Sequence, residues 1–555
     1  MDCYPHKAQY RPGETVLILT EGVPEAAVRL EAALFHLHRE IERLEARPGD
    51  PIAWQSPASA VPTAFGVEVY ALDGRGARLA VAATAFDVAE AWWRAPRLGF
   101  MTDFAVGETL SETQRRFDLL TRLHLNCLHF YDWFFSHHQY LPPEENFVDS
   151  LGRELSLITV RRKIRLAHRA GMVALAYGPV YGAEEAFVAE HPDWALYRSD
   201  GVPFNVARLF YIMDFRPESP WTRHILGQYV QAVAELGFDG VQIDQYGYPK
   251  RALPYPGEMG QASLDLSELF LPFMERAQAA LERVKPGARL IFHAVNNWPL
   301  RQVAGGPQAA NCIQVFSPHE TYRDLRDLVR NARALAPEKP VILAAYLKPF
   351  QSEPPERAEN ALRLLTAVIH AAGGYQVLLG EGDGVLTEGY YPHYARLRPE
   401  GVALMRRYMD FIVRYGPLLH APPEQEISET HCGGVTEVFS FEGAPTSPIP
   451  RPGAVWSAIR DHGGLFSINL VNLTGSGSGR WNEGQADPPV IRSMVAVCKV
   501  LEPVEAVYAA TPDSGTGSLV PLPFTVEPDP HSGHVLRVPL PDLYGWNLIL
   551  ISLRT

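Results

Sequence analysis

The stretch FDGVQIDQYG, residues 238–247, carries a short apolar run that ends in a carboxylate. Val241 and Ile243 predict a buried strand, because a brief apolar run bounded by turn-forming residues is typical of a strand covered on both faces. Asp244 stands at the end of that strand, where parallel barrels place their functional groups. Asp239 stands at its start, and we interpret it as a structural cap of the turn that enters the strand.

Seven further apolar runs surround this one, and amphipathic segments separate them. The runs are GFMTDFAV (99–106), NCLHFYDW (126–133), MVALAYGPV (172–180), ARLIFHAVN (288–296), CIQVFS (312–317), PVILAAYL (340–347) and YQVLLGEG (375–382). The helical segments include SETQRRFDLLTRL (111–123), TRHILGQYVQAVAELG (222–237) and YRDLRDLVRNARAL (322–335). This alternation over residues 96–415 predicts an α/β fold, a (β/α)₈ TIM barrel. An open doubly wound sheet is the alternative, and the lack of a G-x-G-x-x-G turn after the first strand disfavours it.

The segments on either side of the barrel are rich in predicted strands. Residues 1–95 contain TVLILT (15–20) and FGVEVYALD (65–73), which predict a small β domain. A helix is expected within PEAAVRLEAALFHLHREIERLEA (24–46), where Leu30, Leu34, Leu37 and Ile41 follow a helical spacing. Residues 416–555 contain HGGLFSINLVNL (462–473) and GWNLILISL (545–553) between Gly- and Pro-rich turns, and they predict a C-terminal antiparallel β-sandwich.

Composition excludes several classes of function. The net charge of -13 and the lack of a Lys/Arg cluster argue against a nucleic-acid partner. No apolar run is long enough to span a bilayer, so no membrane partner is expected. The five cysteines are scattered and lack C-x-x-C spacing, so we expect neither a zinc site nor a disulfide framework. The start MDCYPHKAQY has no signal-peptide core, which predicts a cytoplasmic protein, or a secreted one if cleavage precedes this start. The oligomeric state is not readable from the sequence.

Polar and aromatic side chains follow most of the predicted strands. A single aspartate in such a place more often caps a helix than acts in catalysis. Convergence from many strands instead favours a pocket for a polar small molecule, and a sugar is the natural ligand because rings stack on aromatic faces while Asp, Asn and His bond hydroxyls. The candidates are Asp103, Asp132, Trp133, His137, His138, Tyr177, Tyr181, Tyr246, Asn296, Tyr346, Glu381 and Tyr391.

Several of these residues lie in longer segments that resemble glycoside hydrolase family 66, the family of dextranases and cycloisomaltooligosaccharide glucanotransferases. The segments are HFYDWFFSHHQYLPP (129–143), AHRAGMVALAYGPVYGA (167–183), FYIMDFRPESPW (210–221), FDGVQIDQYG (238–247), FHAVNNW (292–298), VILAAYL (341–347) and AVIHAAGGYQVLLGEGDGVLTEGYYP (367–392). The resemblance implies a barrel between an N-terminal immunoglobulin-like domain and a C-terminal β-sandwich. It also implies action on α-1,6-linked glucan with retention of configuration, by hydrolysis or by cyclisation, without metal or cofactor.

The resemblance assigns roles to individual residues of this chain. Asp244 falls on the family's catalytic nucleophile, and Asp214 joins the candidates in substrate-binding segments. The acid/base position departs from the pattern, because the family places a glutamate at the end of the sixth strand and this chain has Gln314 there. A carboxamide can neither protonate a leaving oxygen nor deprotonate water.

Three explanations of Gln314 are open. The chain is a deliberate Glu-to-Gln variant, a natural relative whose activity is lost or changed, or an enzyme in which Glu320 supplies the proton from a folded-back loop. The last explanation requires the Asp244 and Glu320 carboxyl groups to lie about 5–5.5 Å apart, the spacing of retaining enzymes. A non-catalytic carbohydrate-binding relative and a glycosidase of another linkage specificity are the rival functions.

Overall fold

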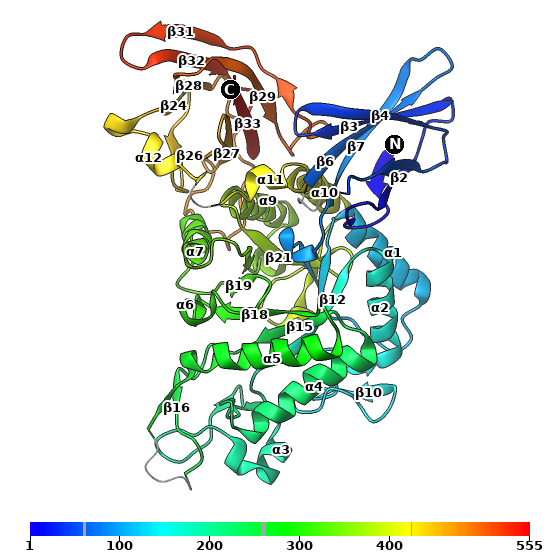
Figure 1. Cartoon of the computed structure of the whole chain (residues 1–555), viewed down its shortest axis with the longest axis vertical. Helices are drawn as coiled ribbons and strands as arrows, with labels where there is room; N and C mark the ends of the chain where they lie inside the picture. Colours follow the sequence, from blue (N-terminus) through cyan, green and yellow to red (C-terminus); the bar gives the residue numbers. More distant parts are fainter. Residues whose placement is uncertain (59–62, 257–261, 423–424, 555) are drawn as a thin grey trace.

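The computed structural model describes residues 1–58, 63–256, 262–422 and 425–554, and its centre is a closed parallel barrel (Figure 1). Its strands are β8 (Leu98–Met101), β9 (Cys127–Phe130), β12 (Val173–Pro179), β15 (Gly240–Asp244), β18 (Arg289–Val295), β19 (Asn311–Gln314), β20 (Val341–Ala344) and β21 (Tyr375–Gly380). Each strand pairs in parallel with the next, and β21 pairs with both β20 and β8, which closes the ring. The predicted (β/α)₈ barrel is confirmed.

Helices follow the barrel strands and cover the outside of the ring. They are α1 (Leu110–Arg122), α2 (Leu157–Arg169), α4 (Pro220–Leu236), α5 (Phe270–Val284), α6 (Leu300–Val303), α7 (Tyr322–Leu335), α9 (Pro355–Ala371) and α10 (Pro399–Arg414). Thr109 and Thr321 open α1 and α7 with capping boxes, each closed by an acidic residue three positions later. After β18 the helix is reduced to the single turn α6, which leaves the chain between β18 and β19 short.

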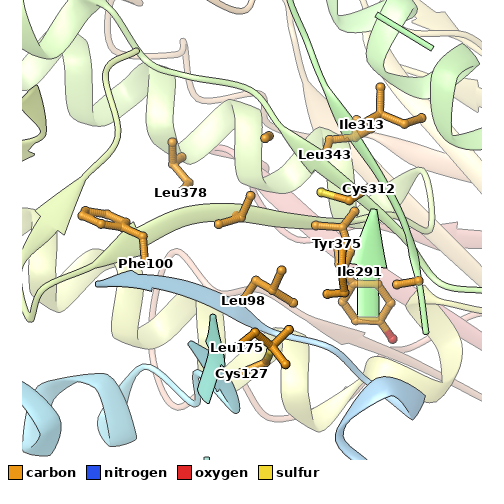
Figure 2. Close-up of a cluster of buried hydrophobic side chains, with 14 of the residues drawn as sticks. Leu98, Phe100, Cys127, Leu175, Ile291, Cys312, Ile313, Leu343, Tyr375 and Leu378 are labelled. Atoms are coloured by element: carbon orange, nitrogen blue, oxygen red, sulfur yellow. The ribbon is translucent and has the colours of Figure 1, made fainter. Parts of the chain in front are cut away.

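The barrel interior is filled by side chains rather than by a channel. Figure 2 shows Leu98, Phe100, Cys127, Leu175 and Ile291 converging there from successive strands, and all of them are buried. At Gly240 a Cβ atom would lie 1.7 Å from the Arg289 carbonyl oxygen, so only glycine allows β15 to approach β18 this closely. This approach fixes the strand that carries Asp244.

At the N-terminal end of β15, Asp239 holds the strand in place through contacts with neighbouring residues. Its Oδ2 accepts a hydrogen bond from the Ala174 amide at 2.8 Å, and its Oδ1 lies 2.7 Å from Lys285 Nζ. Burial raises the pKa of Asp239, but the contacts with His168 and Lys285 lower it by more. The pKa of Asp239 therefore lies below its ordinary value. Asp239 is therefore a structural group, as its place before the strand predicts.

The N-terminal domain consists of two antiparallel sheets around a shared core. One contains β1 (Asp2–Pro5), β2 (Thr15–Glu21) and β5 (Ile52–Gln55), and the other β3 (Arg29–His36), β4 (Arg39–Ala46), β6 (Thr63–Leu72) and β7 (Arg78–Val88). The helix expected within residues 24–46 is wrong, because this segment is the β3–β4 hairpin. Its side chains alternate with period two: Leu30, Ala32 and Leu34 face the core, while Arg29 and Glu31 pair with Glu45 and Arg43 across the strands.

The C-terminal domain is the predicted antiparallel sandwich. One sheet contains β24 (Phe439–Glu442), β28 (Val495–Val500), β31 (Thr525–Asp529) and β32 (Gly533–Pro539). The other contains β25 (Thr446–Ser447), β26 (Val455–Asp461), β27 (Leu465–Asn472), β29 (Val504–Ala510), β30 (Val520–Pro521) and β33 (Trp546–Leu553). In Figure 1 both β domains lie at one end of the long axis, and the segments α3 (Glu185–Glu190) and β16 (Arg251–Ala252) lie at the other.

Short elements lie in the loops that leave the barrel strands and, for α11 and α12, in the segment between α10 and the C-terminal domain. They are β10 (Asn146–Val148), β11 (Glu154–Ser156), β13 (Asn205–Val206), β14 (Phe210–Tyr211), β17 (Leu264–Asp265), β22 (Gly384–Val385), β23 (Ala395–Arg396) and the turns α8 (Pro349–Ser352), α11 (Gly416–Leu419) and α12 (Ser428–His431). Across the four described ranges, no helix has the length and apolar character needed to cross a membrane.

Candidate active site

The site is built around Asp244, whose side chain lies at the C-terminal end of β15 and is 8% exposed. Tyr177 from β12 donates a hydrogen bond from its hydroxyl to Asp244 Oδ2 at 3.1 Å. Gln314 from β19 donates from Nε2 to Asp244 Oδ1 at 3.3 Å. The carboxylate is therefore held by a residue from the neighbouring strand β12 on one side and by one from β19, two strands away, on the other.

His293 from β18 is the third group against Asp244. Its Nδ1 lies 3.4 Å from Asp244 Oδ1 and 2.9 Å from Gln314 Nε2, while its Nε2 contacts the side-chain amide of Gln242. Burial lowers the pKa of His293, but Cys312 and the Asp244 carboxylate raise it more, to about 10. His293 and the Asp244 carboxylate thus form a buried pair, and Gln314 completes a three-residue cluster.

Aromatic rings surround this cluster. Tyr131 stacks on Tyr391 with ring centroids 4.4 Å apart and lies 4.8 Å from Tyr177, and Tyr346 lies 6.1 Å from Tyr391. Burial, with a contribution from Asp244, raises the pKa of Tyr177 well above its ordinary value. Its hydroxyl therefore stays protonated and remains a donor to the nucleophile position.

Asp132, at the end of β9, is a second carboxyl group in the barrel mouth. It is 4% exposed, and among the described residues its Oδ1 has no hydrogen-bond partner. Burial raises its pKa to about 6, although His137 and Arg153 act in the opposite direction. Of the two oxygens, Oδ2 lies 3.9 Å from Arg153, so Oδ1 is the atom left for a ligand.

Four residues after barrel strands adopt left-handed backbone conformations that are uncommon outside glycine: Asp132 with φ 46°, Asn296 with φ 48°, Asn297 with φ 69° and Glu381 with φ 45°. Such strained positions cluster at functional sites because the surrounding structure must hold them. Asn296 shows one consequence: its Oδ1 accepts from the Phe316 amide at 2.7 Å and its Nδ2 donates to the Ser317 carbonyl at 2.7 Å. It thereby shapes the loop directly after Gln314, and we assign it this positioning role in place of the predicted contact with substrate.

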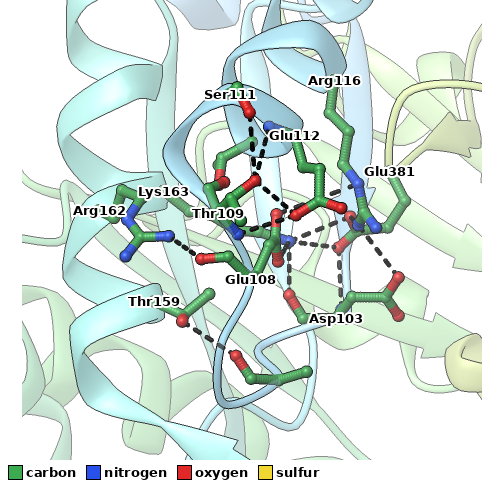
Figure 3. A network of polar contacts seen from close by, with 12 residues as sticks. Asp103, Glu108, Thr109, Ser111, Glu112, Arg116, Thr159, Arg162, Lys163 and Glu381 are labelled. Carbon is green, nitrogen blue, oxygen red and sulfur yellow. Dashed lines mark hydrogen bonds and ion pairs between the residues drawn. The ribbon is translucent and has the colours of Figure 1, made fainter.

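Glu381 and Asp103 belong to a separate network on the other side of the mouth (Figure 3). Glu381 is fully buried; Oε1 accepts from the Thr102 and Asp103 amides, while Oε2 lies 2.5 Å from Arg116 and 3.1 Å from Lys163. Both oxygens are occupied by protein groups, so the structure does not support the expectation that Glu381 binds substrate. Asp103 is bound by Arg116 and Tyr394, and it is partly exposed.

Other predicted contacts also lie inside the protein. Trp133 and Tyr181 are fully buried, so neither offers a face to a sugar ring, and Asp214 forms an ion pair with Arg216 at 2.7 Å. His137 and His138 both bind Glu184, His137 through its amide and His138 through its ring. Tyr246 lies among them, packed on Tyr181 and Phe210. Trp133, Tyr181, Asp214 and His137 are thus buried in the wall of the mouth, whereas His138 and Tyr246 are partly exposed.

Glu320 lies outside the cluster. It forms an ion pair with Arg480 of the C-terminal domain, and its side chain is 40% exposed. The structure thus gives Glu320 a surface partner, whereas Gln314 contacts Asp244 directly. Of the two candidates for the acid/base position, the geometry favours 314.

The sequence analysis gave no role to Gln242, His293 or His129. Gln242 stands two positions before Asp244 and therefore points to the same side of β15. His129 lies in the barrel on β9, 5.9 Å from His293 ring to ring. Alternate residues of a strand point to the same side, so counting back in steps of two from each strand end would have identified these residues. The described residues contain no group of three or more His, Cys, Asp or Glu side chains that could hold a metal ion.

This chain is similar to known proteins in sequence and in fold. The profile of Glycosyl hydrolase family 66 matches residues 5–550. A cycloisomaltooligosaccharide glucanotransferase of Niallia circulans is 21% identical over 99% of this chain and 71% of that protein, and a dextranase of Streptococcus salivarius is 22% identical over 88% and 67%. The crystal structure of a Paenibacillus cycloisomaltooligosaccharide glucanotransferase complexed with cycloisomaltoheptaose superposes with a TM-score of 0.87 at 19% identity, covering 99% of each chain. The chain belongs to glycosyl hydrolase family 66.

Proposed function

We propose that this chain binds α-1,6-linked glucan at the barrel mouth, with Asp244 as the nucleophile of a retaining reaction. The relatives support the substrate class, since one is a cycloisomaltooligosaccharide glucanotransferase and another is a dextranase. The fold neighbour was crystallised with cycloisomaltoheptaose. Of the rings around Asp244, Tyr177 and Tyr391 are buried and Tyr131 is partly exposed, so Tyr131 is the ring that suits a sugar.

The observation that carries the mechanism is the contact between Gln314 and Asp244. In double displacement, a carboxylate attacks the anomeric carbon while an acid protonates the departing glycosidic oxygen, and the side-chain ends lie close together. The 3.3 Å contact between Gln314 Nε2 and Asp244 Oδ1 supports residue 314 as the acid position, and it is shorter than the about 5–5.5 Å between the two carboxyl groups of retaining enzymes. With Gln314 the attack has no proton donor, so the native chain is expected to bind glucan and to cleave it slowly.

Replacement of Gln314 by glutamate tests this proposal. We expect Gln314→Glu to raise dextran cleavage by about 10²–10⁴-fold, the usual contribution of general acid/base catalysis. Reducing ends and cyclic products should both be measured, because they separate hydrolysis from cyclisation. Gln314→Asn is the matched control, since it keeps the amide and should show no gain.

An activated substrate separates an inactivated enzyme from a binding protein. Fluoride leaves without a proton, so an α-glucosyl fluoride extended with isomaltosyl units should react with Asp244 of the native chain. The Asp244 Oδ–C1 bond forms, the C1–F bond breaks, and intact-mass measurement should detect the glycosylated protein. Asp244→Asn should abolish the adduct. Binding of isomaltooligosaccharides without an adduct, and without activity in Gln314→Glu, would instead support a non-catalytic carbohydrate-binding protein.

A further inference from the structure

A pocket of about 520 Å³ lies next to the Asp244 cluster, between the barrel and the C-terminal domain. The barrel contributes the loops after β19, β20 and β21, including Phe316, Tyr346 and Lys348. The C-terminal domain contributes Arg480, Trp481 and Asn482. The volume falls in the range of about 300–1,000 Å³ that is typical of small-molecule sites.

The segment from the C-terminal domain is firmly attached to the barrel. The Trp481 amide and indole Nε1 donate to the carbonyls of Glu320 and His319 at 3.1 and 2.9 Å. Asn482 Oδ1 accepts from the Lys348 amide at 2.9 Å. Trp481 itself is 3% exposed, so it anchors the segment and does not offer a face to a ligand. This wall of the pocket is therefore a fixed part of the folded protein.

The lining suits a neutral, hydroxyl-rich ligand. Phe316 is 39% exposed, which is unusual for a large apolar side chain, and its ring packs against Tyr346 at 5.7 Å. Lys348, Arg480, Glu320, Glu388 and Glu483 surround these rings with charges of both signs. Aromatic faces with a polar rim of mixed sign are the surface that a sugar ring stacks on while its hydroxyls find donors and acceptors.

The position of the pocket relative to Gln314 indicates which sugar units enter it. Phe316 follows Gln314 by two residues, and Tyr346 connects through Tyr391 to the rings around Asp244. The leaving part of the glucan must extend past the acid/base position, on the side away from the nucleophile. We infer that this pocket holds the leaving-group and acceptor glucosyl units, with Phe316 as the stacking platform and residues 480–483 of the C-terminal domain as its outer wall.

Gly389 keeps the platform accessible. A Cβ atom at this position would lie 3.5 Å from Phe316 Cζ and 3.9 Å from Tyr346 Cε2, which are ordinary contact distances. A larger side chain there would therefore cover the ring edges without an immediate clash with the backbone. Phe316→Ala removes the platform and Gly389→Val fills the space above it, so the two substitutions test the same pocket by opposite changes.

The inference rests on the proposed function, and the native chain allows a test by binding alone. Affinity for isomaltotriose and for isomaltoheptaose should be measured by calorimetry. We expect Phe316→Ala and Gly389→Val to weaken binding of the longer ligand by roughly two- to tenfold, the worth of one aromatic contact, with a smaller effect on the shorter ligand. Phe316→Trp should restore affinity, and Leu501→Ala, at an exposed position on the C-terminal domain, should have no effect.

The possible failures are distinguishable. If neither oligosaccharide binds the native chain, the proposed function is wrong. If both bind and Phe316→Ala and Gly389→Val leave the affinities unchanged while thermal unfolding shows folded proteins, the pocket is not an acceptor site and this inference is overturned. Crystals of the native chain with isomaltoheptaose would then show where the chain of sugars leaves the mouth.

Discussion

Two buried clusters lie at the mouth of the same barrel, one around Glu381 and one around Asp244. They differ in the chemical groups that contact the carboxylate. Around Glu381, Arg116 and Lys163 supply two cations and the backbone two amides, and both carboxylate oxygens are occupied. Around Asp244, a histidine, an amide and a tyrosine hydroxyl make longer contacts of 3.1–3.4 Å. The first arrangement fixes β21 against β8, and the second holds a carboxylate that can change partners.

The difference follows from the chemistry of the partners. Two cations and two backbone amides occupy both oxygens of Glu381, and a neutral ligand cannot replace them. Around Asp244, neutral Gln314 and Tyr177 can give way to a substrate hydroxyl. A strand-end carboxylate is thus structural or catalytic according to whether its neighbours are fixed cations or exchangeable donors.

Truncation of the two carboxylates should give the largest contrast in stability. Glu381→Ala leaves Lys163 in the interior without its main partner, and breaking such a buried pair costs about 3–5 kcal/mol. Asp244→Ala should cost about 1–2 kcal/mol, because His293 can become neutral and only hydrogen bonds are lost. Denaturant unfolding at neutral pH measures both, and equal losses would show that the two clusters do not differ in this way.

A smaller effect is expected at Asp132, where the pH dependence has a defined sign. Its folded pKa of about 6 exceeds the ordinary value of 3.8, so ionisation opposes folding. The penalty is absent below about pH 3.8, grows up to about pH 6 and then reaches at most about 3 kcal/mol. Asp132→Asn should therefore gain stability over the native chain from about pH 4.5 to about pH 7.5, and asparagine tolerates the left-handed backbone there.

Unfolding free energies of both proteins at these two pH values provide the measurement. The difference between the proteins removes contributions from other titrating groups. Were Asp132→Asn the less stable protein at neutral pH, the carboxylate would be ionised and held by Arg153 and His137, and Asp132 would resemble Glu381 rather than an open position.

The sequence alone predicts the barrel well because each βα unit is locally marked. The apolar runs, the capping residues Thr109 and Thr321, and the spacing of α1 and α7 all agree with the final packing. The β3–β4 hairpin was missed because Leu30, Leu34, Leu37 and Ile41 satisfy a helical spacing, while the cross-strand pairs Glu31–Arg43 and Arg29–Glu45 become visible only once the strands meet.

For the site, the sequence predicts which residues end the strands and not the direction in which each side chain points. Asp244 is predicted because it ends an apolar run and because the resemblance marks its position, whereas Gln314 is predicted from the resemblance alone. Trp133 and Tyr181 stand in equivalent places, yet both are buried in the wall. The sequence predicts a ligand contact at Glu381 because its partners Arg116 and Lys163 come from helices α1 and α2, far away in the sequence.

The smallest effect is expected at the exposed ion pair between Glu320 and Arg480, and it decides the remaining candidate for the acid/base role. Both side chains are about 40–46% exposed, and such surface pairs contribute about 0–1 kcal/mol. Glu320→Gln should thus change the unfolding free energy by less than about 1 kcal/mol. In the Gln314→Glu background it should also leave the rate of dextran cleavage unchanged, because residue 314 alone contacts Asp244. A loss of that rate comparable to the loss in Asp244→Asn would mean that Glu320 reaches the leaving oxygen when substrate displaces Arg480, and the acid/base assignment would move from residue 314 to residue 320.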